Sequence, residues 1–250
     1  MHSLAAIIAL LSTTMVTAAS LPPRNDPYYI THRPSTFTTS PSVRPTDSAS
    51  LHQAPTNVQA AQAGPTAMTV TIMNQAGFPV STTHGVNTLG PLTTILPTVF
   101  LPGPDVLANG GSHTYVLPLG HGGNLGVAKG KFLGDESLVE YTFGDQDGIN
   151  KIAINVSYVT GFTYNIDCTC SDGTHLSGCT EPLWSQSTCE QPNGEGACKN
   201  PLRATGGPPA HPFFQKCEGK AYTFSGDHAA LNNGGCATGS VTCKILSGGN

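Results

Sequence analysis

Residues 138–158 read LVEYTFGDQDGINKIAINVSY, and this stretch decides the class of fold. Over residues 151–158, Ile, Ile, Val and Tyr occupy every second position. This period of two residues predicts a strand with one buried face. Residues 144–148 consist of Gly, Asp and Gln and separate the two apolar runs, which predicts a hairpin turn. The stretch is therefore predicted to form two paired strands.

Shorter runs of the same kind lie at residues 68–73 and 113–119. The chain also contains 29 glycines and 20 prolines, which interrupt it too often for long helices. Several short strands joined by turns are typical of an antiparallel sandwich. We therefore predict an all-β fold, an antiparallel β-sandwich with a disulfide-rich loop region, in one domain over residues 66–246.

The N-terminal part of the chain has a different composition. Residues 4–11 form an apolar run that small residues follow, and this run is well short of the ~20 apolar residues that span a bilayer. The pattern predicts a cleaved signal peptide over residues 1–19. Residues 20–65 are rich in Pro, Ser and Thr, which favours a disordered tail or pro-segment. We expect a secreted protein, extracellular or in a cell wall, with no membrane partner.

All eight cysteines lie between Cys168 and Cys243. An even number of cysteines in an exported chain predicts disulfide bonds rather than zinc ligands. The close pair Cys168 and Cys170 is also spaced more tightly than the paired ligands of structural zinc sites. Counting alone leaves the pairing of the cysteines open. We expect loops held by disulfides, packed beside the sandwich.

Charge and motifs exclude several classes of function. The chain has 11 Lys and Arg against 15 Asp and Glu, a formal net charge of −4, and no basic stripe for nucleic acid. Its histidines show no ligand-like spacing, so we expect no metal or other cofactor. Neither a Gly-x-Ser-x-Gly elbow nor a His-Glu-x-x-His helix is present.

Acidic residues suggest one kind of chemistry. Five of them lie within residues 135–147, namely Asp135, Glu136, Glu140, Asp145 and Asp147, and Asp227 lies far along the chain. Glycoside hydrolysis needs two carboxyl groups that flank the scissile bond. The alternative is that these side chains are solvated charges of turns and strand ends. Strand alternation places Glu140 opposite Val139 and Tyr141, on a face that is either exposed or part of a cleft.

Asn155-Val156-Ser157 is the only Asn-x-Ser/Thr sequon of the chain. Asn155 lies on the polar side of the clearest strand, where a glycan has room. The sequence therefore predicts N-glycosylation at Asn155.

Several segments together resemble the thaumatin-like proteins. They are residues 138–143, 154–162, 211–217 (HPFFQKC), 221–224 (AYTF) and 241–243 (VTC). The Cys-x-Cys start at Cys168 and the Asn-Pro-Leu-Arg segment at 200–203 are most similar to the fungal secreted branch, described as antigenic thaumatin-like proteins. The resemblance is specific over about residues 138–243 and is weaker but colinear from about Ala67.

The resemblance implies a β-sandwich whose disulfide-rich loops flank an acidic cleft. Members of the family bind β-1,3-glucans, and some hydrolyse them. Glu140 matches the glutamate of the family's cleft, and Asp227 matches its last aspartate. Two further aspartates of the cleft correspond to Asn155 and Thr160, so this chain lacks both charges. It therefore resembles a family member that has lost part of its acidic site.

The resemblance also implies a pairing of the cysteines. The implied bonds are Cys168–Cys243, Cys170–Cys217 and Cys179–Cys189, with Cys198–Cys236 as the remaining pair. On this pairing, the first two bonds would fasten the loops that wall the cleft to the sandwich.

We therefore predict a monomeric, secreted protein that binds β-1,3-glucan or another cell-wall polysaccharide without strong catalysis. One alternative is a weak β-1,3-glucanase that uses Glu140 and Asp227. Another is a non-catalytic structural protein of a cell wall, or a secreted effector aimed at a host. A sugar platform would use aromatic side chains. The candidates are Tyr141, Tyr158, Tyr164, Trp184 and Tyr222.

Overall fold

The computed structural model describes residues 64–86, 94–96, 105–146, 149–205, 207–230 and 235–249. The predicted signal peptide and all but the last two residues of the predicted tail lie outside this set. The described residues form two large β-sheets and one two-stranded sheet, with four disulfides, so the predicted all-β sandwich is confirmed. None of the helices within these residues is long and apolar enough to cross a membrane.

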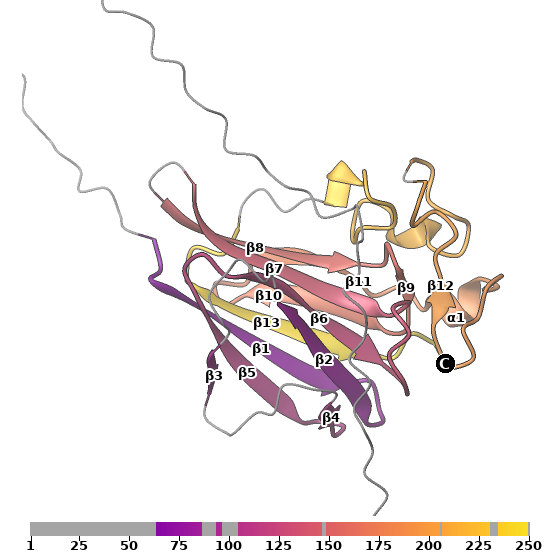
Figure 1. Ribbon diagram of the computed structural model, residues 1–250, viewed down its shortest axis with the longest axis horizontal. Coiled ribbons are helices and arrows are strands. Elements are labelled where there is room, and N and C mark those ends of the chain that lie inside the picture. The colour runs from indigo at the N-terminus through magenta and orange to yellow at the C-terminus, as the bar shows by residue number, and fades with distance from the viewer. Residues whose placement is uncertain are drawn as a thin grey trace, which may run out of the picture. The chain divides into compact units, whose positions relative to one another are not determined.

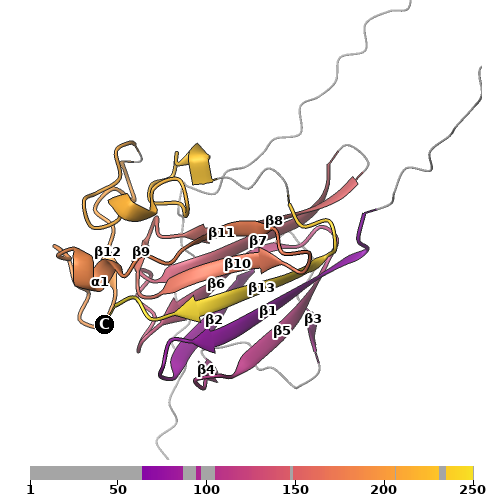
Figure 2. The same cartoon turned by 180° about the vertical axis from the view of Figure 1, so that it is seen from behind.

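The six-stranded sheet has the order β11-β10-β13-β1-β5-β3. Its strands are β11 (His175–Cys179), β10 (Asn165–Cys170), β13 (Ser240–Leu246), β1 (Ala67–Gln75), β5 (Ser112–Pro118) and β3 (Thr94–Leu96). Figure 2 shows the last strand, β13, lying between β1 and β10. β1 and β13 run parallel, whereas the other neighbouring strands of this sheet pair antiparallel. The prediction of a purely antiparallel sandwich missed this pair, because β13 returns from the disulfide loops at the end where β1 begins.

The five-stranded sheet has the order β4-β2-β6-β7-β8. Its strands are β4 (Asp105–Leu107), β2 (Val80–Val86), β6 (Gly122–Ala128), β7 (Ser137–Gln146) and β8 (Ile149–Ser157). β7 and β8 form the predicted hairpin, with Glu140 directly opposite Asn155. Asp147 of its turn lies outside the described residues.

The loop region joins β11 to β13 and gathers at one end of the strands in Figure 1. It contains α1 (Leu183–Gln186), β12 (Cys198–Lys199), η1 (Gln215–Cys217) and η2 (His228–Ala230), and β12 pairs with β9 (Gly161–Phe162). The sequence predicts that the cysteine-rich part of the chain is rich in loops, which disulfides hold beside the sandwich. Four of its cysteines instead lie in β10, β11 and β13, so their disulfides anchor in the sheet itself.

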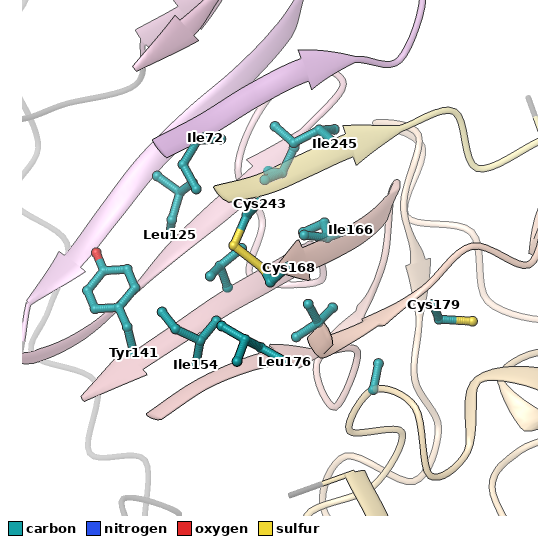
Figure 3. Packing of buried hydrophobic residues seen from close by; sticks show 14 of the residues in the cluster. Ile72, Leu125, Tyr141, Ile154, Ile166, Cys168, Leu176, Cys179, Cys243 and Ile245 are labelled. Carbon is teal, nitrogen blue, oxygen red and sulfur yellow. A yellow bond between two sulfur atoms is a disulfide. The ribbon is translucent and has the colours of Figure 1, made fainter. Parts of the chain in front are cut away.

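The core lies between the two sheets and follows the alternation seen in the sequence. On β7 and β8 it takes Val139, Tyr141, Phe143, Ile152, Ile154 and Val156, all at most 3% exposed. The facing sheet contributes Val70, Ile72, Ile166 and Ile245. Figure 3 shows the Cys168–Cys243 bond among these side chains. Burial of apolar side chains on both inner faces is the main term that stabilises a sandwich.

One disulfide forms as the resemblance implied, and three predicted pairs are wrong. Cys168–Cys243 joins paired residues of β10 and β13. The observed bonds are Cys170–Cys236, Cys179–Cys217 and Cys189–Cys198, in place of Cys170–Cys217, Cys179–Cys189 and Cys198–Cys236.

The reason for the error is the path of the chain after β11. The amide of Gly178 donates to the carbonyl of Lys220, which brings the segment of η1 and its Cys217 to the end of β11. α1 meanwhile leads the chain away from β11, and the amide of Lys199 then donates to the carbonyl of Gln191. Cys189 therefore meets Cys198 across a local turn, and Cys236 remains for Cys170.

Three histidines lie near two tyrosines on the inner side of β2, β5 and β6. Nδ1 of His84 lies 2.6 Å from the Tyr141 hydroxyl, and its ring meets the Tyr115 ring edge-on, with centroids 4.4 Å apart. Burial, which is the largest cause, and the neighbouring His121 and His113 together lower the pKa of His84 from 6.5 to about 4.

Protonation of His84 is therefore expected to destabilise the fold. The unfolded chain binds this proton below about pH 6.5 and the folded chain only near pH 4, so stability is lost as the pH falls through this window. The loss from this group reaches up to ~3 kcal/mol. Urea unfolding at several pH values should show it, and the His84→Gln variant should lack that part of the slope. An equal slope in both proteins would contradict the assignment.

Candidate functional site

The candidate site is the outer face of the five-stranded sheet, the face that points away from the core. Glu140 is paired with Asn124 of β6 on one side and with Asn155 of β8 on the other. Paired residues of antiparallel strands project from the same face, with Cβ atoms roughly 5 Å apart. The three side chains thus form one row across the sheet. Register places further residues on this face, namely Thr83, Gly122, Gly126, Leu138, Thr142, Ala153 and Ser157.

Glu140 is half-buried at the centre of this row. Burial raises the pKa of its carboxyl group, and a hydrogen bond with Ser157 lowers it in part. The side chain therefore keeps its proton to higher pH than an exposed glutamate. A raised pKa of this kind is what a general acid needs near neutral pH.

Tyr222 borders the outer face beside β8. Its amide donates to the Val156 carbonyl at 2.9 Å, and its carbonyl accepts from the Tyr158 amide at 2.7 Å. A parallel bridge to Ser157 aligns it with the outer face. Burial raises the pKa of the Tyr222 phenol, and the charges of Glu140 and Asp227 raise it further. Tyr222 therefore lies close to Glu140.

Phe132 lies over β6, and no pattern in the sequence indicates it. A Cβ atom on Gly126 would lie 3.4 Å from Cε1 of Phe132, so the ring covers this glycine of β6. Phe132 lies in the connection between β6 and β7, where no periodic pattern indicates which way a side chain points. The face thus has one aromatic ring over β6 and another beside β8.

Asp227 has a structural role that its sequence position did not reveal. It is 2% exposed, and its Oδ2 accepts hydrogen bonds from the amide of Gly219 and from the amide and hydroxyl of Thr223. These bonds hold the turn that carries Tyr222. The charges of Glu140 and Asp227 both raise the pKa of the Tyr222 phenol, so both predicted residues lie near Tyr222. Their joint role in catalysis stays a prediction.

Asp135 and Glu136 do not lie on the outer face. Asp135 is buried and receives Nη1 of Arg203 at 2.7 Å and Nδ2 of Asn193 at 3.5 Å. Glu136 accepts hydrogen bonds from the amides of Leu133 and Gly134 and so closes its own loop. Asp135 therefore fastens the β6–β7 connection to the disulfide loops. The side chains of Asp145 and Asp147 lie outside what the structure describes.

Three of the predicted aromatic candidates are buried and not available to a polysaccharide. Tyr141, Tyr158 and Tyr164 are at most 3% exposed and belong to the core. Trp184 packs against Phe213 with ring centroids 5.3 Å apart, and its Nε1 donates to the Thr163 carbonyl. The same alternation that predicted the strands places Tyr141 and Tyr158 at positions that face the core. Trp184 and Tyr222 are both half-buried, and Tyr222 is the one that lies beside the outer face.

A hollow of about 310 Å³ lies between the β6–β7 connection and the loop before β12. It is lined by Lys129, Gly130 and residues 194–196. Lys129 and Glu195 supply its charged groups. Within the described residues, no group of three or more His, Cys, Asp or Glu side chains is placed to hold a metal ion.

The sequence matches no protein-family model and none of the curated proteins compared with it. In a comparison of folds, 26 chains of solved structures match. One of them is a laminaripentaose-producing β-1,3-glucanase in complex with laminaritetraose, at 18% sequence identity and a TM-score of 0.35. The match covers 56% of this chain and 54% of that enzyme, so it spans about half the length of each.

Proposed function

We propose that this chain is a secreted, monomeric thaumatin-like protein that binds β-1,3-glucan of a cell wall through the outer face, without strong hydrolysis. Four disulfides support secretion, because such bonds persist in oxidising compartments. The observation that carries the proposal is the row of Asn124, Glu140 and Asn155. Of the strand residues that register places on this face within the described set, Glu140 alone bears a carboxyl group.

The chemistry of the face suits a sugar chain. The amide and carboxyl groups of the row can form hydrogen bonds with sugar hydroxyls. Tyr222 and Phe132 offer apolar ring surface to a pyranose. Oδ1 of Asn155 is enclosed and has no hydrogen-bond partner in the protein. Buried polar atoms are rarely left unsatisfied, and a ligand can donate to this oxygen once the Asn155 side chain turns outward.

The raised pKa of Glu140 supports a second candidate function, a weak β-1,3-glucanase with Glu140 and Asp227 as its carboxyl pair. Asp227 would then have to act while its Oδ2 holds the turn around Thr223. This alternative expects reducing-sugar release by the unaltered chain. Release that persists in Glu140→Gln would contradict it.

Retention on insoluble β-1,3-glucan tests the proposed function. The unaltered chain, made without N-glycans, should be retained, and Tyr222→Ala should weaken retention about tenfold, as expected for a lost aromatic contact of ~1–1.5 kcal/mol. Leu119→Ala, which shortens a side chain that is 44% exposed in the turn after β5, is the matched control and should bind normally. Retention of the unaltered chain no better than that of an unrelated secreted protein would refute the proposal.

A further inference from the structure

The only sequon of the chain lies in the middle of the outer face. Asn155 stands opposite Glu140, and β8, which carries it, has β7 on one side and the segment of Tyr222 on the other. Ser157, the third residue of the sequon, is bridged to Tyr222. A group attached to Asn155 therefore emerges from the outer face between Glu140 and Tyr222.

We propose that an N-linked glycan on Asn155 occupies the outer face and closes it to cell-wall glucan, an inference that rests on the proposed function. In the attachment step, Nδ2 of Asn155 attacks C1 of the first sugar of a lipid-linked pyrophosphate oligosaccharide. The Nδ2–C1 bond forms, the bond from C1 to the pyrophosphate oxygen breaks, and the leaving lipid pyrophosphate takes up one Nδ2 proton.

Attachment precedes folding of this part of the chain. In the fold, Asn155 is half-buried with Oδ1 enclosed, and the backbone of β8 is paired on both sides around this position. A transferase that must reach the amide therefore meets it before β8 pairs. The attached glycan then has to leave the sheet on the outer side, because the opposite side of β8 faces the core.

The glycan competes with glucan because it is tethered. Its first sugars are pyranoses with the same kinds of hydroxyl and ring surface as a glucan chain, and they lie next to Glu140. A tether of this length gives an effective concentration in the millimolar range. A glucan segment of modest affinity would be displaced by steric exclusion alone.

The experiment compares one sequence in two glycosylation states. The full chain is secreted from a eukaryotic host that attaches N-glycans and is also made in a host that does not. Mass spectrometry of the peptide that contains Asn155 gives the occupancy, and retention on insoluble β-1,3-glucan gives the binding. We expect an occupied Asn155 and at least tenfold weaker binding of the glycosylated form. Peptide N-glycosidase is avoided, because it would convert Asn155 to aspartate beside Glu140.

A glycan at another place serves as the control. Asp172 is exposed in the turn between β10 and β11, and Asp172→Asn makes that turn read Asn-Gly-Thr, a new sequon. In a Ser157→Ala background, which removes the sequon at a residue only 1% exposed and leaves Asn155 in place, this variant should bind equally well from both hosts.

Three results would overturn the inference. They are an unoccupied Asn155, equal binding of the two forms, and an equal loss of binding caused by the glycan on the turn. If neither form binds while both are folded, the proposed function fails and the inference falls with it. If the unglycosylated form binds and the glycosylated form binds equally, the inference alone fails.

Discussion

Asn155→Asp is expected to raise the release of reducing sugar from β-1,3-glucan by ~10²-fold over the unaltered chain, the lower end of the range for a positioned acid or base. The substitution places a second carboxyl group directly across the β7–β8 pair from Glu140. Cβ atoms of such a pair lie roughly 5 Å apart, close to the ~5–5.5 Å between the carboxyl groups of retaining glycosidases. The new charge would raise the pKa of Glu140 further and keep it as the acid.

The comparison requires both proteins to be free of N-glycans, because Asn155→Asp also removes the sequon. Adding Glu140→Gln to the variant should abolish the gain. If Asn155→Asp releases no more sugar than the unaltered chain although it still binds glucan, the missing carboxyl group is not what limits hydrolysis.

Removal of the Cys168–Cys243 bond should cost more stability than removal of the short Cys189–Cys198 bond. The bond closes a loop of 75 residues, for which loss of loop-closure entropy in the unfolded chain corresponds to about 4 kcal/mol. Both cysteines are fully buried and join the middle of β10 to β13. Urea unfolding of the variant with both residues changed to alanine should show a fall of at least this size in the free energy of unfolding.

Cys189–Cys198 is the matched control, because it closes a loop of only 9 residues at the edge of the loop region. The same pair of alanine substitutions there should cost about 2.5 kcal/mol. A loss at Cys189–Cys198 that equals or exceeds the loss at Cys168–Cys243 would refute this ranking.

The strands could be predicted because their signal is local. Alternation over residues 151–158 depends only on which side chains face the core, and β7 and β8 form at the predicted place. The disulfides could not be predicted in this way. Cys170 meets Cys236 because β13 lies beside β10, so that the end of one strand adjoins the start of the other. This contact joins segments that are about 70 residues apart in the chain, so no local sequence pattern indicates it.

The site was predictable to a similar extent. Alternation placed Glu140 away from the core, as observed, and the resemblance pointed to Asn155 on the neighbouring strand. The role of Asp227 was hidden, because its partners Gly219 and Thr223 depend on the shape of a turn. Phe132 was missed for the same reason, since its contact with Gly126 arises from the path of a connection.

We propose above all that glucan binds on the outer face of the five-stranded sheet. Nuclear magnetic resonance of the isotope-labelled chain, made without N-glycans and titrated with a soluble β-1,3-linked gluco-oligosaccharide, tests it most directly. We predict saturable shifts of the backbone amides of Asn124, Glu140, Asn155 and Tyr222, with those of the six-stranded sheet unchanged. Shifts confined to other surfaces, or no shifts in a folded protein, would contradict the claim.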